Sequence, residues 1–138
     1  MNSIETIHLK DIDNLKKRIQ NLYSISQSTP PPEWTSQQKE DVEMSIQGLN
    51  QGQLRICQKE GDLWITQEWL KQAILLYFKL KKMALISVGE FNYVDKIPVK
   101  KWTGNEGVRV VPQALVRHGA YVAPGAILMP SYVNIGAW

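Results

Sequence analysis

The chain has 138 residues, of which 43% are hydrophobic and 21% are charged, and its formal net charge is +3. This composition is that of an ordinary globular chain, which excludes an intrinsically disordered segment, and the length suits one domain or two small units that share a core. The positive excess is too small to predict a nucleic-acid partner unless the charges cluster.

Residues 4–22 carry the first predicted helix, because their apolar side chains recur at helical spacing. The side chains expected to face the core are Ile12, Leu15, Ile19 and Leu22. The basic side chains expected to point away from it are Lys16, Lys17 and Arg18. The stretch SQSTPPPEW follows, and its three prolines indicate a stiff connector rather than a ligand for an aromatic groove.

A second helix is predicted to begin after Thr35, which has Gln38 in the position that completes a capping box. The two glycines in GLNQGQ are expected to end this helix. Its expected buried stripe consists of Val42, Ile46 and Leu49.

A β-hairpin is predicted over residues 53–66, where two β-rich runs flank a glycine-containing turn. Thr66 is then expected to cap a third helix, in which the nearly continuous apolar run 73–78 predicts a buried centre. The lysines that gather near its end, where positive charge favours the helix dipole, are Lys79, Lys81 and Lys82. Residues 1–95 are predicted to form one helical N-terminal domain.

The stretch from Ala84 to Trp102 is predicted to be extended, and residues 96–109 are expected to connect two units. TGNEG within this connector predicts a flexible turn. Its pair of glycines, Gly104 and Gly107, does not make a phosphate loop, because a preceding strand, a following helix and the Lys-Ser/Thr pair are missing.

From Val110 onward the sequence repeats every six residues. The first position of each hexad is aliphatic, the third is often proline and the fifth is small, which is typical of a parallel β-helix. The first positions are Val110, Val116, Val122 and Leu128, and the fifth positions are Ala114, Ala120 and Ala126. Residues 110–138 are therefore predicted to begin a hexapeptide β-helix in a chain of α+β class. Because each coil is stabilised by the next, we expect this β-helix to be truncated.

Several motifs resemble those of the tetrahydrodipicolinate N-succinyltransferase family. They are EGVRVVPQALVRHGA and LMPSYVNIGA, preceded in matching order by GQLRI, LWITQEWLKQAILLYFKL and YVDKIPVK. The resemblance implies a helical N-terminal domain followed by a left-handed parallel β-helix. It also implies a homotrimer that transfers succinyl from succinyl-CoA to a small dicarboxylate in the diaminopimelate route of lysine biosynthesis, without a bound cofactor or metal.

The resemblance assigns one binding residue, since Arg109 in GVRVVP matches the family's substrate-binding arginine. An arginine suits this role because its planar fork can hold a carboxylate through two hydrogen bonds. The family's chains are about twice as long, and their acidic residues for substrate binding and amine deprotonation follow NIGA. We therefore expect no catalytic residue in this chain and predict that it is inactive alone.

Two further residues are candidates for secondary roles. Arg117 occupies a second hexad position, which faces outward, so it lines either a subunit interface or solvent. Asn134 replaces an aliphatic residue at a first position, where a buried amide needs partners; a corner bond or asparagine ladder is favoured over a ligand role. Asp95 and Glu106 lie in loops without any feature that would raise their pKa.

The remaining reactive side chains predict no metal or nucleophile. His8 and His118 are isolated from other metal-binding residues, and Cys57, the single cysteine, is expected to be a structural thiol in a strand. A lone cysteine fits a reducing compartment, and no apolar run approaches the roughly 18 residues of a membrane span. The sequence therefore predicts a cytoplasmic protein without a membrane partner. The alternative to the transferase is a complete short protein without catalysis that binds a β-helical partner.

Overall fold

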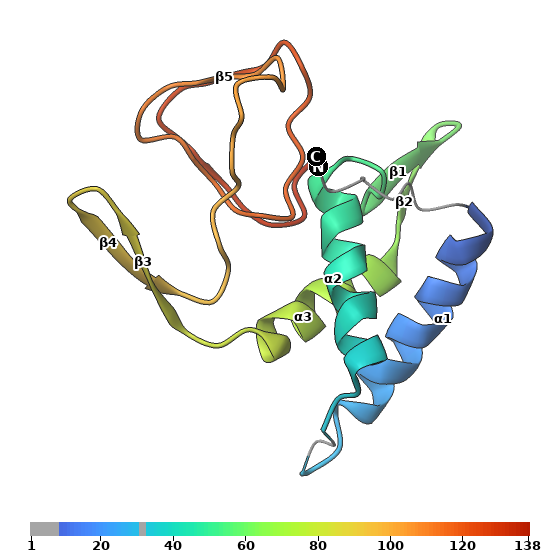
Figure 1. Ribbon diagram of the computed structural model, residues 1–138. Helices are drawn as coiled ribbons and strands as arrows, with labels where there is room; N and C mark the ends of the chain where they lie inside the picture. Colours follow the sequence, from blue (N-terminus) through green and yellow to red (C-terminus); the bar gives the residue numbers. More distant parts are fainter. Residues whose placement is uncertain (1–8, 31–32) are drawn as a thin grey trace.

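The computed structural model describes residues 9–30 and 33–138 and shows a small α+β fold (Figure 1). Among these residues the helices are α1 (Leu9–Ile25), α2 (Ser36–Asn50) and α3 (Glu68–Leu80). The helices pack against one another, and their apolar side chains supply most of the core. The largest fully buried apolar members include Leu15, Ile19, Leu22, Ile46, Leu70, Leu76 and Tyr77.

The inner face of α1 lies where the helical spacing predicted it, but the first residues of the predicted helix lie outside the described residues. Arg18 corrects the expectation that its basic residues point away. Its guanidinium donates two hydrogen bonds to the carboxylate of Asp41 on α2, at 2.8 and 2.9 Å. Asp41 is buried, so the arginine neutralises a charge that would be costly to leave unpaired.

The capping box of α2 is confirmed. The hydroxyl of Thr35 accepts from the backbone N–H of Gln38, and the Gln38 side chain accepts from the backbone N–H of Thr35. The expectation that two glycines end this helix is half right. Gly48 is buried within the helix, whereas Gly52 follows the C-cap at a φ of +75°. That left-handed conformation is the usual reason for glycine just after a helix.

The predicted hairpin is present as β1 (Cys57–Glu60) and β2 (Leu63–Thr66), which pair antiparallel and are exposed along their length. The predicted cap at Thr66 is wrong. Thr66 remains in the strand opposite Cys57, and Gln67 takes the N-cap position of α3 without a side-chain hydrogen bond.

The helix α3 contacts both other helices, as its apolar run predicted, although Leu75 within that run is half exposed. Its terminal lysines do more than face the helix dipole. The ammonium of Lys79 donates to the backbone oxygen of Ser26, and Lys81 pairs with Glu43. The carbonyl of Phe78 instead accepts from Lys96, which lies beyond the next hairpin.

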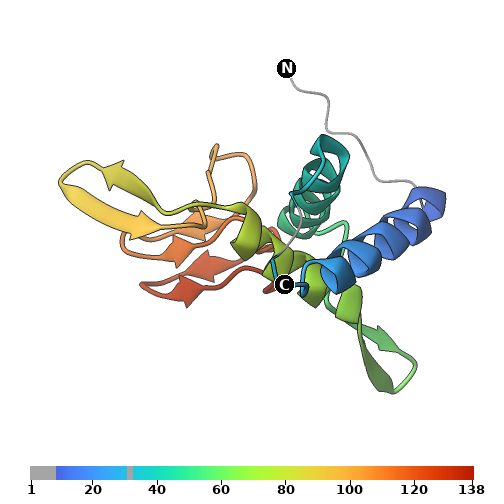
Figure 2. The same ribbon diagram turned by 90° about the horizontal axis from the view of Figure 1, so that it is seen from below.

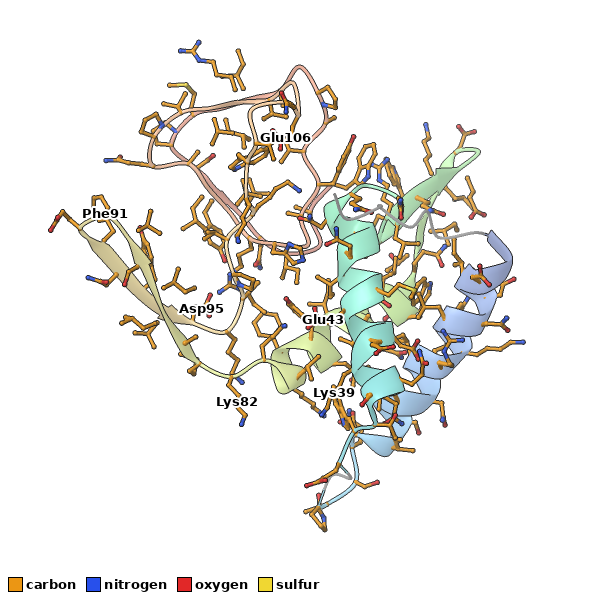
Figure 3. The ribbon with its side chains drawn as sticks, in the orientation of Figure 1. Lys39, Glu43, Lys82, Phe91, Asp95 and Glu106 are labelled. Atoms are coloured by element: carbon orange, nitrogen blue, oxygen red, sulfur yellow. The ribbon has the colours of Figure 1, made fainter. Side chains whose placement is uncertain are left out.

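A second antiparallel hairpin, β3 (Ala84–Val88) and β4 (Phe91–Asp95), occupies the stretch predicted to be extended. The two hairpins project from the helices in different directions (Figures 1 and 2). Phe91 lies at the tip of the second hairpin, and Asp95 lies at its base (Figure 3).

Residues 109–138, called the coil below, return upon themselves in parallel register. The strand β5 (Arg109–Val110) pairs with β7 (Ile127–Leu128), eighteen residues later. The strand β6 (Leu115–Val116) pairs with β8 (Tyr132–Val133), seventeen residues later. Seen end-on, the second pass of the chain overlies the first (Figure 1).

The change from eighteen to seventeen residues corrects the position assigned to Asn134. A strict hexad places Asn134 above Val116, but Val133 pairs there instead. Tyr132 explains the shorter repeat, because it stands at the fifth position, where earlier hexads have alanine, and its ring is exposed. A slip of one residue turns a strand side chain to the opposite face, so Asn134 is exposed rather than buried.

Candidate functional site

Arg109, the predicted substrate ligand, lies in the short strand β5 at the start of the coil. Its backbone N–H donates to the carbonyl of Ala126 at 3.0 Å, which fixes its place on the next pass of the chain. Its side chain is exposed and forms no hydrogen bond or ion pair with any residue of 9–30 or 33–138. The guanidinium therefore keeps all its donors for a ligand, as a carboxylate-binding arginine requires.

The turn that precedes Arg109 is organised by Glu106. One carboxylate oxygen accepts from both the backbone N–H and the hydroxyl of Thr103, each at 2.8 Å, and the other accepts from the backbone N–H of Gly104 at 3.0 Å. The hydrogen bonds from Thr103 are the main reason that the pKa of Glu106 falls to about 2. The turn predicted to be flexible is therefore held by an ionised carboxylate.

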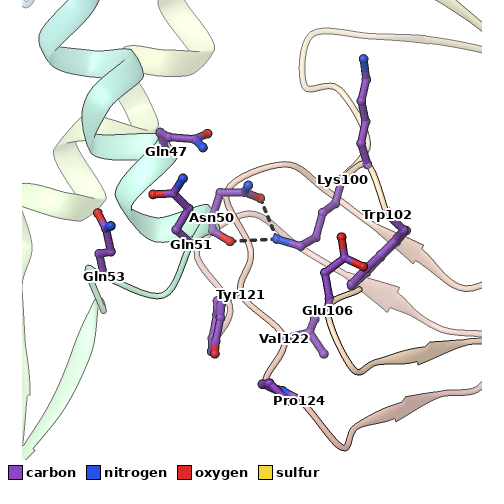
Figure 4. Close-up of a pocket in the computed structure, with 11 residues that line it drawn as sticks. Gln47, Asn50, Gln51, Gln53, Lys100, Trp102, Glu106, Tyr121, Val122 and Pro124 are labelled. Carbon is purple, nitrogen blue, oxygen red and sulfur yellow. Dashed lines mark hydrogen bonds between the residues drawn. The ribbon is translucent and has the colours of Figure 1, made fainter. Parts of the chain in front are cut away.

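A pocket of about 510 Å³ lies between the end of α2, the connector and the coil (Figure 4). Glutamine and asparagine side chains from the helix end form one wall, and Trp102 and Glu106 belong to the opposite side. The residues that line it are Gln47, Asn50, Gln51, Gln53, Lys100, Lys101, Trp102, Glu106, Tyr121, Val122 and Pro124. The pocket therefore offers amide groups, an aromatic surface and one exposed cation, Lys101.

Lys100 bridges the walls of this pocket, and its ammonium is hydrogen-bonded within the chain. Its ammonium donates to the backbone oxygen of Asn50 at 2.8 Å, to the Oδ1 atom of Asn50 at 2.9 Å and to the carbonyl of Ala120 at 3.0 Å. These three bonds use every donor of the ammonium. Burial lowers the pKa of Lys100, which the nearby carboxylate of Glu106 partly opposes.

Arg117 and Asn134 lie next to each other on successive passes of the coil. One guanidinium nitrogen of Arg117 donates to Asn134 Oδ1 at 3.3 Å, and the other pairs with Asp95 at 2.7 Å. The guanidinium also lies over the rings of Phe78 and Tyr132, at 5.7 and 5.8 Å from their centroids. Arg117 is therefore not simply solvated. It ties the coil to the second hairpin and to α3.

Asn134 Oδ1 also accepts from the backbone N–H of Ile135, so the expected corner bond is present.

The remaining reactive side chains form no metal site or catalytic cluster in the part of the chain that the structure describes. Over that part, no cluster of His, Cys, Asp or Glu could hold a metal ion. Burial is the main reason that the pKa of His118 is lowered, and Lys100 lowers it further. Cys57 lies in a strand, as predicted, and is exposed. None of the described helices combines the length and the apolar character needed to span a bilayer.

Comparison with known proteins identifies the family. Residues 14–80 match a family model described as "Tetrahydrodipicolinate N-succinyltransferase N-terminal". A 2,3,4,5-tetrahydropyridine-2,6-dicarboxylate N-succinyltransferase of Delftia acidovorans is 46% identical over 123 residues, which are 84% of this chain and 43% of that protein. The enzyme of the same name from Sodalis glossinidius is 38% identical over 133 residues, which are 92% of this chain and 48% of the relative. The chain belongs to the tetrahydrodipicolinate N-succinyltransferase family.

The resemblance drawn from the motifs is thus confirmed, and the similarity extends beyond them. The chain spans less than half the length of the curated family members that it matches. A third member, from Pasteurella multocida, is 44% identical over 108 residues, which are 74% of this chain and 39% of that protein.

Two residues of this site were not recognised from the sequence of this family member. Lys100 stands beside Lys101 in VKKW, and nothing in the sequence distinguishes the engaged lysine from the exposed one. For Glu106 a signal was present. Thr103 and Glu106 have the Thr-x-x-Glu spacing at which side chain and backbone cap each other, as Thr35 and Gln38 do at α2.

Proposed function

We propose that this chain contributes the N-terminal part of an enzyme that transfers succinyl from succinyl-CoA to the amino group of ring-opened tetrahydrodipicolinate. The similarity to proteins named for this transfer supports the proposal. In the reaction the substrate nitrogen attacks the thioester carbon, a C–N bond forms, the C–S bond breaks, and the thiol leaves with a proton. The reaction serves the diaminopimelate route to lysine in the cytoplasm, with succinyl-CoA as co-substrate and no bound cofactor.

Within this function we assign Arg109 to a substrate carboxylate. The observation that carries the assignment is an exposed guanidinium that forms no hydrogen bond or ion pair with residues 9–30 or 33–138, on a strand that pairs with β7. The other arginines of the described residues are engaged within the chain, and Arg55 among them lies over the rings of Trp64 and Trp138. Arg18 pairs with Asp41, and Arg117 pairs with Asp95.

We propose that residues 110–138 begin a left-handed parallel β-helix, that residues 1–95 form a helical N-terminal domain with the hairpin 53–66, joined to the β-helix by residues 96–109, and that the enzyme is a homotrimer. The parallel pairing at eighteen and seventeen residues supports the β-helix, since a three-sided coil of six-residue sides has this length. We propose that a neighbouring subunit contacts the exposed Asn134, whereas Arg117 is half-buried against the second hairpin and is a secondary candidate for that interface.

We also propose that the 138-residue chain does not catalyse the transfer alone. Deprotonation of the substrate amine needs a general base within reach, with a pKa near the working pH. The two acids of the region, Asp95 and Glu106, are engaged with Arg117 and with the 103–104 backbone, and the low pKa of Glu106 makes it a poor base. We propose neither a nucleic acid nor a membrane as a partner of this chain.

The test measures thiol release from succinyl-CoA in the presence of tetrahydrodipicolinate. We expect none above the no-enzyme control for the 138-residue chain. We expect release when the chain is fused to the C-terminal part of the Delftia acidovorans relative, and a loss of roughly 100-fold in kcat/KM when this fusion carries Arg109→Gln. Release by the short chain would contradict its inactivity, and a folded but inactive fusion would contradict the proposed function.

A further inference from the structure

The segment that presents Arg109 is attached to the coil on one side only. Its strand has two residues and, within the described part of the chain, pairs with β7 alone, through the N–H groups of Arg109 and Val111, which donate to Ala126 and Leu128. A two-residue strand with one neighbour contributes few backbone hydrogen bonds, and such elements open locally at low free-energy cost. Something before the strand must therefore restrain the arginine if its guanidinium is to meet a ligand in a fixed place.

The Thr103–Glu106 turn supplies this restraint. The carboxylate of Glu106 accepts three hydrogen bonds from two residues, which closes the turn. The next residue, Gly107, is fixed in its turn, because its carbonyl accepts from the N–H of Gly125 at 2.8 Å. Only Val108 then separates this anchor from Arg109.

We propose that Glu106 is a positioning residue, which holds the strand of Arg109 in register on the coil so that the guanidinium is placed to bind a dicarboxylate. The identity of the ligand in this inference rests on the proposed function, whereas the restraint of the strand by Glu106 does not. The carboxylate acts through the backbone of residues 103–109 and does not touch the substrate. Its low pKa agrees with this role, since a carboxylate ionised at neutral pH accepts strong hydrogen bonds from backbone N–H groups.

The first test is amide hydrogen exchange in the 138-residue chain. In Glu106→Gln, the nitrogen of the amide cannot accept the bond from Gly104, so the turn loosens. We expect exchange at the amides of Arg109 and Gly125 to accelerate about fivefold to tenfold, while amides in α2 and α3 keep their protection. The matched control is Glu90→Gln, which changes an exposed glutamate in the turn of the second hairpin. Unchanged exchange at both amides in Glu106→Gln would overturn the proposal.

The second test separates positioning from general stability. In the fused enzyme described above, Glu106→Gln is expected to raise KM for tetrahydrodipicolinate about tenfold while leaving KM for succinyl-CoA unchanged, because only the dicarboxylate meets Arg109. Thr103→Ser keeps the hydroxyl donor and is expected to behave as the unaltered enzyme, whereas Thr103→Val is expected to shift the same KM in the same direction. An equal effect on both substrates, or none, would contradict the positioning role. If the fusion is inactive, the proposed function fails while hydrogen exchange still decides the role of Glu106.

Discussion

The ammonium of Lys100 lies 2.8 Å from the backbone oxygen of Asn50 and 2.9 Å from its side-chain oxygen, which joins the connector to the last residue of α2. The same ammonium reaches Ala120, and Asn50 Oδ1 also accepts from the backbone N–H of Gly119 at 3.2 Å. One lysine and one asparagine therefore link three segments that are far apart in the sequence. This contact is one of those that hold the coil on the helices.

Lys100→Met is expected to lower the free energy of unfolding by about 1–3 kcal/mol, because three acceptors lose a charged donor and methionine supplies none. Lys101→Met is the control, since Lys101 is the next residue in the connector and its side chain is exposed. Urea denaturation followed by tryptophan fluorescence measures both. Equal stability of the two variants would contradict the role given to Lys100.

Arg18→Met is expected to destabilise the helical unit, because it leaves the buried carboxylate of Asp41 without its two charged donors. Arg18 is itself nearly half exposed, so we expect a loss of about 2 kcal/mol rather than the larger values of fully buried pairs.

The double variant Arg18→Met with Asp41→Leu removes both charges and is expected to recover most of that stability, since the cost comes from the unpaired acid. Thermal unfolding of the single and double variants measures the coupling. Purely additive losses would mean that the ion pair is not the reason for the effect.

The sequence predicted best those local structures that depend only on residues close together in the chain. The capping box at Thr35 and Gln38 and the hairpin at residues 57–66 depend on neighbours in the chain, and both are present. The contacts of Lys100 and Arg18 could not be predicted in this way. Lys100 contacts a residue 50 positions away in the sequence, and Arg18 contacts one 23 positions away. Each contact depends on how two elements pack.

The hexad shows a limit of another kind. Its period identified the coil, but the count failed at the last repeat, where Tyr132 occupies the fifth position. A ring cannot enter the narrow corner that alanine fills in the earlier repeats, so it faces solvent and the repeat loses one residue. The exception was visible in the sequence. The direction of the resulting slip, and hence the exposure of Asn134, required the structure.

Acid is expected to open the Thr103–Glu106 turn. The folded-state pKa of Glu106, about 2, lies below its ordinary value of 4.5, so its ionisation favours the closed turn. This contribution is complete above the unfolded pKa and is lost as the pH falls through the folded value. We expect the amide signals of Thr103 and Gly104 in NMR spectra to titrate together with a midpoint near 2, and Glu106→Gln to abolish the titration. A midpoint near 4.5 would contradict the hydrogen-bonded turn.

Gly119→Ala is expected to destabilise the protein more than Gly125→Ala, because only the first substitution adds a clash to the backbone strain that both share. Both glycines have positive φ, +91° and +87°, so alanine meets backbone strain of about 1 kcal/mol at either position. A methyl group at Gly125 would meet no atom within 4 Å, whereas one at Gly119 would lie 2.7 Å from Ile135 and 3.0 Å from Ile46. Ile46 belongs to α2, so the added methyl would push the coil away from the helices. We therefore expect Gly119→Ala to lose about 1–3 kcal/mol more than Gly125→Ala in urea denaturation. Equal losses would mean that the coil and α2 are not in the close contact described here.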